Sequence, residues 1–484
     1  MRQIGLGSYD KRLAASARTL LECQGFDGGW GLTLSSVSSI VNTSEVLAVL
    51  RAARIGGTPV RSALDFLAGS IKEHCRPRQK GGRGKNTRFV CFGLTGLLHY
   101  REFFTQPHVC GTAAWCLDWL EEHQIGQGWP EVVGIDDASL HQTALAVLAL
   151  ARLRDVLDGL GPGLSLPGGG DTTALVERTS ALIEHGLAGL LYHRRPSGAW
   201  GWRTYIDTAP SPSKTALCLL AIDAATSRDG ADRVLEAGGV DGRPAGLPAR
   251  GIITQAGQWL LKNHHRWELF VEDDKDVQGT AWEHMAYALG TQAVLRAGAN
   301  PNDQRLVKAW KLMDRLWDGQ AGLWSEPGAS GRRATIRAAY YSVCAYEEAR
   351  ARIVELGMSE HDDAPTRLEA TPVLPREISL FSEGNQIVVS TADASVNCTL
   401  SERLFDLAVL LHHEAEGLAV CQLATAMHVA PTSIAKYVQR LNAAISTSFG
   451  GVPIRVVIAC QTPEGSGYQL VVPTEGRKSP GRPA

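Results

Sequence analysis

The chain of 484 residues carries 48 Lys and Arg against 50 Asp and Glu, which gives a net charge of −2 at pH 7. This length allows two or three domains with ample cores, and the near-neutral charge gives no overall attraction to nucleic acid or anionic membranes. The ten cysteines are scattered without a Cys-x-x-Cys pair, and a charge or turn interrupts every apolar stretch before about 18 residues. We therefore expect a cytoplasmic protein with reduced thiols and no membrane-spanning segment.

Six segments in the first three-quarters of the chain share one pattern, in which a loop rich in Gly and Trp is followed by a threonine and an apolar run. The threonines, 44 to 72 residues apart, are Thr43, Thr87, Thr143, Thr215, Thr280 and Thr335. A repeated unit of this size is typical of arrays in which neighbouring units bury each other's apolar faces. We expect each threonine to open a helix.

Each repeat predicts two helices joined by a loop. In the first unit one helix runs from about Tyr9 to Cys23, the loop begins at Gln24, and the second helix starts near Thr43. Apolar residues recur at helical spacing in these stretches. The second helix is almost wholly apolar, as in 144–151, where every residue is Ala, Leu or Val, and this suits a helix surrounded by protein. Two Gly- and Pro-rich insertions, 159–171 and 228–251, predict surface loops.

The loops resemble the QW motif of the squalene-cyclase and prenyltransferase superfamily, in which a Gln is followed by a Gly and a Trp. The matching residues are Gln24, Gly28 and Trp30; Trp119, Leu120, Gln124, Gly128 and Trp129; Gly198 and Trp200; and Asp318, Gly322 and Trp324. We expect the Gln to bond backbone at helix ends, the Gly to allow the turn, and the Trp to pack between repeats. The resemblance implies a mainly α fold, an (α/α)6 toroid of six inner and six outer helices over residues 1–352. An open helical solenoid is the alternative.

The residues that carry out catalysis in this superfamily are replaced. Class II terpene cyclases protonate their substrate with the central Asp of an Asp-x-Asp-Asp-Thr-Ala motif, and in the corresponding segment 276–281 Gln278 and Gly279 stand in place of that acid and its neighbour. An amide cannot deliver a proton to an alkene. The Asp-x-Cys zinc ligands of protein prenyltransferases are also missing, and we expect His284 and Cys218 to be core residues. The resemblance therefore implies a pseudoenzyme with no catalytic residues, metal or cofactor.

Two acidic pairs occupy equivalent places before the repeated threonines. Asp136 and Asp137 precede one inner helix by the same offsets as Asp273 and Asp274 precede another, so all four are expected at one mouth of the toroid. One interpretation is helix capping, for which Asp is well suited. The other is a site for a cationic or metal-bridged ligand. Asp276 and Gln278 are further candidates for that ligand site.

The sequence pattern changes after the repeats. Residues 353–375 mix charge and proline and predict a linker, residues 376–473 predict a second domain, and residues 474–484 predict a disordered tail. Within the domain, the segment 377–390 alternates around a Gly-Asn turn and predicts a hairpin. A helix is expected from Ser401, then a short helix, a turn at 429–431, and a longer helix from Thr432. Strands are expected near 454–460 and 468–472.

This order of elements resembles the OmpR-type winged helix-turn-helix domain, an α+β domain that binds DNA. The resemblance implies that one helix enters the major groove and that the hairpin at 462–467 is the wing. The residues placed on DNA by this resemblance are Thr432, Ser433, Lys436, Tyr437 and Arg440. Against DNA binding, five Lys and Arg and eight Asp and Glu give residues 376–473 a net charge of −3, whereas phosphate binding favours positive charge.

Three functions are open on this sequence. The first is a bacterial transcription regulator, in which the toroid senses a ligand or partner and the winged helix binds double-stranded DNA. The second is a non-catalytic adaptor of a multi-protein system, such as a defence system, with both domains as docking surfaces. The third is an isoprenoid-handling enzyme with altered catalytic residues. The corresponding partners are double-stranded DNA, another protein, or a small hydrophobic ligand inside the toroid.

Overall fold

The structure is a computed structural model. It describes residues 6–75, 87–134, 137–167, 171–201, 209–228, 233–237, 245–268, 283–328, 331–356, 377–381, 385–390, 395–413, 418–427, 434, 437–438, 440–441, 457–462 and 465–470. The described residues up to 356 form a helical ring, and those from 377 onward form a smaller α+β part. The described helices include none that is both long and apolar enough to cross a membrane.

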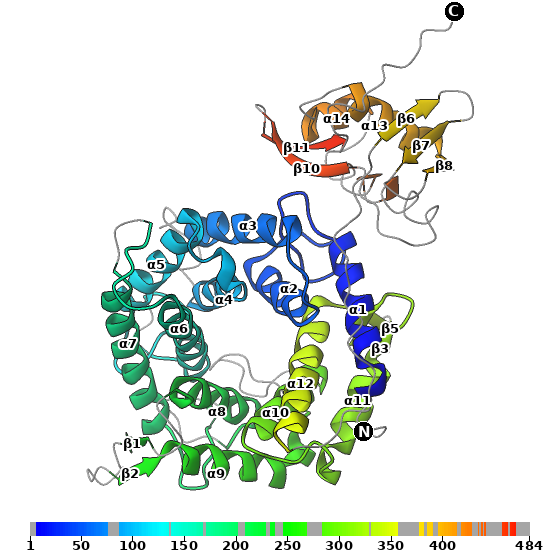
Figure 1. Cartoon of the computed structure of the whole chain (residues 1–484). Coiled ribbons are helices and arrows are strands. Elements are labelled where there is room, and N and C mark those ends of the chain that lie inside the picture. Colours follow the sequence, from blue (N-terminus) through cyan, green and yellow to red (C-terminus); the bar gives the residue numbers. More distant parts are fainter. Residues whose placement is uncertain are drawn as a thin grey trace, which may run out of the picture. The chain divides into compact units, whose positions relative to one another are not determined.

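Within the described residues, α-helices alternate between the outside and the inside of the ring (Figure 1). The outer helices are α1 (Leu6–Glu22), α3 (Thr58–His74), α5 (Pro107–Glu122), α7 (Thr172–Tyr192), α9 (Ala249–Lys262) and α11 (Val307–Leu316). The inner helices are α2 (Ile40–Ala52), α4 (Thr87–Leu98), α6 (Leu140–Leu160), α8 (Pro212–Thr226), α10 (Glu283–Arg296) and α12 (Ile336–Glu355). Short 3-10 turns η2 (Arg101–Phe103), η3 (His264–Arg266) and η4 (Gln304–Leu306) lie in the connections.

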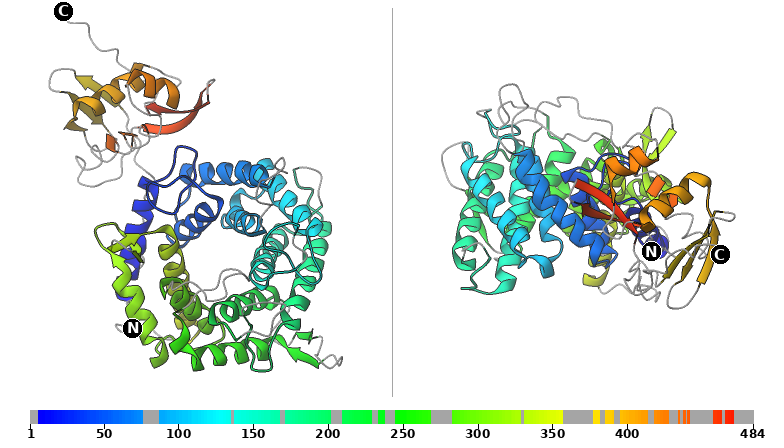
Figure 2. Two further views of the ribbon diagram at one scale, coloured as in Figure 1. Left: turned by 180° about the vertical axis from the view of Figure 1, so that it is seen from behind. Right: turned by 90° about the horizontal axis from the view of Figure 1, so that it is seen from above.

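The inner helices form a closed ring. Each packs against the inner helix before it and the one after it, and the last, α12, packs against the first, α2 (Figure 2). Because the ends meet, the described chain is a toroid and not an open solenoid. In α8, 13 of the 15 residues are buried, which explains why the inner helices are apolar on almost every side.

Three inner helices begin one turn earlier than the repeated threonine. Their first residues follow a serine whose hydroxyl accepts a hydrogen bond from a backbone N–H three residues later. These N-cap serines are Ser39, Ser139 and Ser211. The prediction that the threonine opens the helix is therefore wrong for α2, α6 and α8. It is correct for α12, which Thr335 caps. Thr87 is the first described residue of α4, since residues 76–86 are not described, and Thr280 lies outside the described residues, so the prediction stays a prediction for these two helices.

The threonine hydroxyl instead joins the loop to the inner helix. Thr143 Oγ1 accepts a hydrogen bond of 3.1 Å from the backbone N–H of Trp129, and the N–H of Ser139 donates to the Trp129 carbonyl at 2.8 Å. Equivalent bonds join Trp200 to Thr215 and Ser211. In α6 and α8 the cap is therefore supplied by the serine one turn before the threonine.

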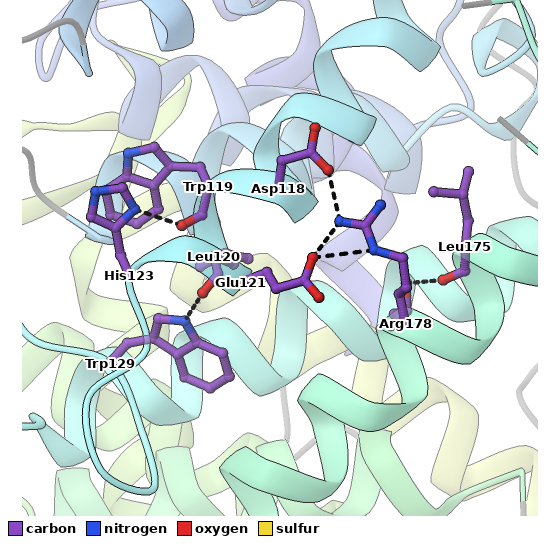
Figure 3. A network of polar contacts seen from close by, with 9 residues as sticks. Asp118, Trp119, Leu120, Glu121, His123, Trp129, Leu175 and Arg178 are labelled. Atoms are coloured by element: carbon purple, nitrogen blue, oxygen red, sulfur yellow. Dashed lines mark hydrogen bonds and ion pairs between the residues drawn. The ribbon is translucent and has the colours of Figure 1, made fainter. Parts of the chain in front are cut away.

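The loop tryptophans also hold the end of the preceding outer helix. In Figure 3 the indole N–H of Trp129 donates to the carbonyl of Leu120 near the end of α5, at 2.7 Å. The same bond recurs from Trp30 to Leu20, from Trp200 to Leu190 and from Trp324 to Met313. The ring of Trp129 packs beside His185 and Gly186 of α7, in the next repeat. This confirms the predicted packing between repeats.

The Gln and Gly of the first loop act as predicted. The Gln24 amide donates to the carbonyls of Gly28 and Pro59, each at 2.8 Å, so it ties the loop to the first turn of α3. Gly28 has a φ of +83°, and a Cβ there would lie 2.2 Å from the carbonyl oxygen of Ser62. Only glycine fits this position, because both the conformation and the space exclude a side chain.

Neighbouring outer helices are joined by ion pairs on the surface. Arg178 of α7 binds Asp118 of α5 at 2.7 Å and also binds Glu121 (Figure 3). All three side chains are substantially exposed, so this network contributes about 1 kcal/mol or less.

Short strands interrupt the helical repeats at two places. In the segment 228–251, predicted as loop, β1 (Val234–Ala237) pairs antiparallel with β2 (Ala245–Pro248). Between α11 and α12, the strands β3 (Trp317–Asp318), β4 (Leu323–Gly328) and β5 (Gly331–Ala334) form an antiparallel sheet, and β4 packs on α12.

The described residues of the C-terminal part include two small antiparallel sheets, the helices α13 and α14, and helical residues between 434 and 441. The first sheet has the order β6 (Glu377–Phe381), β7 (Gln386–Ser390), β8 (Ser395–Thr399). Its first two strands confirm the predicted hairpin, with Asn385 at a φ of +51°, whereas β8 was not predicted. The elements that follow are α13 (Glu402–His413), β9 (Leu418–Ala419), α14 (Val420–Ala426), β10 (Val457–Thr462) and β11 (Gly465–Leu470). In the second sheet β11 lies between β10 and β9.

The predicted linker and tail are largely outside the described residues. Helix α12 ends at Glu355 and Leu356 is the last described residue before 377, so most of the predicted linker, like the predicted tail, is not described.

The contact between loop and inner helix gives a stability prediction. Thr143→Val removes the acceptor of the buried Trp129 N–H but keeps the side-chain shape, so we expect the free energy of unfolding to fall by about 1–3 kcal/mol. Urea unfolding followed by circular dichroism measures it. Thr105→Val, at an exposed position, is the control and should change stability by less than about 0.5 kcal/mol. Equal, small effects of both substitutions would contradict the proposed contact.

Candidate functional site

A cavity of about 300 Å³ lies inside the ring and is lined by the five inner helices α4, α6, α8, α10 and α12. Each helix contributes one stripe of side chains. From α6 the stripe is Leu145, Leu148, Arg152 and Asp155, spaced three or four residues apart as one face of a helix requires. The volume is at the lower end of the range for small-molecule sites.

A narrow ring of largely apolar side chains, here called the waist, lies between the cavity and a second, smaller space. It consists of one residue from each lining helix: Phe92, Leu145, Leu217, Leu289 and Tyr341. These five residues line both the main cavity and a second space of about 20 Å³ toward the beginnings of the inner helices. The waist therefore separates two polar ends and offers an apolar surface to a ligand.

The wider end of the cavity, toward the ends of the inner helices, is charged. Arg296, the last residue of α10, bonds Glu348 of α12 at 2.6 Å and lies 3.6 Å from Asp223 of α8. Burial raises the pKa of Asp223 and of Glu348, although Arg296 acts in the opposite direction on both. One arginine thus holds two carboxylates from neighbouring helices.

Arg152 is the other arginine at this end, and its surroundings differ. It is exposed, and its guanidinium lies 3.4 Å from the ring nitrogens of His99. Burial, together with Arg152 and Arg51, holds the pKa of His99 well below its ordinary value, so that ring is neutral at pH 7. Among the described residues Arg152 forms no ion pair, which makes it the cavity's available cation.

The narrower end is buried. Arg88, His141 and Arg337 line the small space there, near the first residues of α4, α6 and α12, and Lys214 of α8 is fully buried nearby. Burial, with Lys214 and Arg88, holds the pKa of His141 well below its ordinary value.

A buried ion pair at this end joins the first and last inner helices. Glu45 of α2 lies 3.6 Å from the Arg337 guanidinium and accepts a hydrogen bond of 2.9 Å from Asn42. Burial raises the pKa of Glu45, while Arg337 and Arg88 oppose that rise. Removing Arg337 would leave the buried Glu45 carboxylate with less compensation, so this pair helps to fix the closure of the ring.

The residues considered for metal binding lie in the core. His284 is 2% exposed, and burial together with Arg337 lowers its pKa to about 4, so it is neutral at pH 7. Cys218 is also buried. Among the described residues, His, Cys, Asp and Glu nowhere gather in the groups of three that would hold a metal ion.

The acidic residues proposed from the sequence are not part of the described cavity lining. Asp137 is exposed and does not line either space. The remaining candidates of this set, Asp136, Asp273, Asp274, Asp276 and Gln278, lie outside the described residues.

The cavity residues that the sequence analysis missed have a detectable signal. Arg152 and Asp155 in α6, Asp223 in α8, and Arg296 in α10 are charged residues within helices that are otherwise nearly all apolar. In a helix packed on both flanks and on its outer side, a charge that has no buried partner is favoured only toward the cavity. Charged residues at helical spacing inside an apolar run are therefore a signal in the sequence that indicates this site.

Two of the proposed DNA-contacting residues are described. Ile434, Val438 and Leu441 are buried at the spacing of one helical face, while Arg440 is exposed and Tyr437 is intermediate. Arg440 therefore lies on the open side of a helical segment. Thr432, Ser433 and Lys436 lie outside the described residues.

Comparison with solved structures supports the toroid. The chain is similar to cellobiose 2-epimerase from Spirochaeta thermophila, with 14% identity and a TM-score of 0.50 over 72% of this chain and 98% of that one. It is also similar to a D-mannose isomerase, with 9% identity and a TM-score of 0.50 over 72% of this chain and 97% of that one. A type II terpene cyclase from Scytonema matches with 14% identity and a TM-score of 0.40, over 72% and 98% of the two chains.

At these identities the likeness establishes the (α/α)6 toroid fold alone. The similar structures include sugar-processing enzymes and a terpene cyclase, and those activities belong to those proteins. No protein-family model matches the sequence, and comparison with curated proteins gives no match.

The shared arginine at the wide end gives a pH-dependent prediction. Because the folded-state pKa values of Asp223 and Glu348 are raised, their contribution to stability is fully present below the ordinary carboxyl pKa and is lost as the pH rises through the raised values. Arg296→Gln removes the positive charge that lowers the pKa values of Asp223 and Glu348, so both pKa values rise further. We expect it to cost about 1–3 kcal/mol at pH 8 and clearly less at pH 5, measured by urea unfolding.

Arg305→Gln is the matched control. Arg305 is 47% exposed, as is Arg296, but it pairs on the surface with Asp303, whose pKa is lowered chiefly by the hydrogen bond from Arg305. Asp303 stays ionised at both pH values, so the control should cost at most about 1 kcal/mol at either. A cost of Arg296→Gln that does not change with pH would contradict the prediction.

Proposed function

We propose that this protein is a ligand-responsive DNA-binding regulator, in which the toroid binds a small molecule in its central cavity and the C-terminal part is a winged helix domain that binds double-stranded DNA. The observation that carries the proposal is the order of elements after residue 376. A three-stranded sheet precedes α13, a short strand, α14, a helical segment and a final hairpin, and β9 pairs with the second strand of that hairpin. This is the order expected of an OmpR-type winged helix.

The helical segment supports the DNA-binding role. Its buried face, Ile434, Val438 and Leu441, holds it to its own domain, and Arg440 is exposed on another side. A recognition helix needs this division, because one face must anchor the helix while another reaches bases and phosphates.

The cavity supports the sensing role. It combines an apolar waist with a charged, accessible end, and small-molecule sites typically pair an apolar lining with a few placed polar groups. The toroid is proposed to be non-catalytic, since Gln278 replaces the proton-donating acid of the terpene cyclases and an amide is not a general acid.

The adaptor function is the second candidate, and one observation favours it. Residues 376–473 hold five Lys and Arg against eight Asp and Glu, a net charge of −3. Non-specific DNA binding depends on positive charge. A domain with this net charge should therefore bind random duplexes poorly, and any affinity for DNA must come from a specific site.

The proposal predicts the effect of removing two basic residues from the recognition helix. In the full chain, Lys436→Ala with Arg440→Ala should weaken binding to a DNA site, selected from a random library at low salt, by roughly 2–5 kcal/mol. The slope of log Kd against log salt concentration should become shallower by the amount that about two phosphate contacts contribute. Fluorescence anisotropy measures both quantities.

Arg403→Ala provides the control, because it removes a positive charge from α13 and not from the proposed recognition helix. It should change the affinity less than tenfold. If no DNA is retained from the library and the chain instead binds another protein stably, the regulator proposal fails and the adaptor function replaces it.

A further inference from the structure

We propose that the toroid cavity binds a medium-chain carboxylic acid, with the carboxylate on Arg152 and the hydrocarbon chain against the apolar waist. This inference rests on the proposed ligand-binding role of the toroid and adds the chemical class of the ligand. A ligand of this class is shorter than a polyprenyl chain and carries less charge than a diphosphate, so the proposal distinguishes this cavity from a site for polyprenyl diphosphates.

The charge of the ligand follows from the two arginines of the wide end. Arg296 is neutralised by Glu348 and Asp223, at 2.6 and 3.6 Å. Arg152 has only the neutral ring of His99 as a polar contact among the described residues. An arginine in this position binds an anion, and its planar fork of N–H donors matches a carboxylate.

The nature of the head group follows from the acids around it. Asp155 and Asp223 line the same cavity as Arg152. They would repel a phosphate or diphosphate, with its two or more negative charges, more strongly than a carboxylate, with one. Burial raises the pKa of Tyr340 and Tyr341 above the ordinary value, so both phenols stay uncharged and add no negative charge to the cavity wall.

The length of the hydrocarbon part follows from the helix that carries the arginine. Leu145 of the waist and Arg152 are seven residues apart on one face of α6, a rise of about 10 Å. An extended chain advances roughly 1.2 Å per bond, so about eight bonds span this distance. Leu148, between these two residues on the same face of α6, and Leu220 of α8 line the same cavity.

Calorimetric titration of the full chain with octanoate, octan-1-ol, octylamine and octyl phosphate tests the proposal. We expect octanoate to bind most tightly, octyl phosphate and octanol at least about tenfold more weakly, and octylamine not measurably. Tighter binding of octyl phosphate than of octanoate would overturn the carboxylate assignment, and equal binding of octylamine would overturn the role of Arg152.

Three variants locate the site. Arg152→Gln should weaken octanoate roughly 10- to 100-fold and leave octanol unchanged, as expected for loss of a charged hydrogen bond. Leu220→Trp should fill the cavity and abolish binding of both. Arg178→Gln, on the outer surface between α5 and α7, should change neither. Octanoate binding that survives both Arg152→Gln and Leu220→Trp, in variants with native circular dichroism, would refute the site.

The outcome is independent of DNA binding, which is measured separately on the selected site. Octanoate binding without DNA binding would leave the carboxylate site intact and overturn the regulator function. DNA binding by a chain that binds none of the four probes would overturn the carboxylate site and leave the regulator function with another ligand.

Discussion

Closure of the inner ring is the constraint on which the rest of the structure depends. Helix α12 packs on α2, and the buried pair of Glu45 and Arg337 joins them. Every inner helix then has an inner neighbour on each flank and outer helices behind it, so only one stripe of side chains remains open. Burying a charge away from that stripe is costly, and Arg152, Asp155, Asp223 and Arg296 of α6, α8 and α10 line the cavity. The same constraint produces both the fold and the candidate site.

The sequence predicted most of the fold because its signals are local and repeated. The loops around Trp30 and Trp129, together with the apolar inner helices, predicted an array of helical repeats, and the resemblance to the QW-motif superfamily implied a toroid. The structure adds the hydrogen bonds that the repeated loops share, including that from the Trp129 N–H to Thr143. The helix starts were displaced by one turn because a Ser cap and a Thr acceptor both suit a helix beginning, and only the tertiary contact distinguishes them. The strand β8 was missed although its pairing with the neighbouring β7 is local, because the residues around it lack a clear alternation of apolar and polar side chains.

The candidate site was harder to predict, for a physical reason. The acidic pairs near Asp137 attracted attention because they repeat in sequence, yet Asp137 is exposed. Arg152 and Arg296 have different surroundings, although both are arginines of inner helices at the wide end. Their difference lies in partners from other helices: Glu348 and Asp223 neutralise one, and only the neutral His99 contacts the other. Such partners are set by ring closure and have no counterpart in sequence spacing, whereas the stripes of charge within apolar runs are visible there.

A ligand in the toroid that regulates DNA binding by the C-terminal part must alter the affinity of the chain for DNA. The most direct measurement is the Kd of the full chain for its selected DNA site, with and without saturating octanoate. Regulation by the ligand predicts a change of about fivefold or more in this Kd, absent in the Arg152→Gln chain at the same octanoate concentration. An unchanged Kd, with the cavity shown by calorimetry to be saturated, would contradict it.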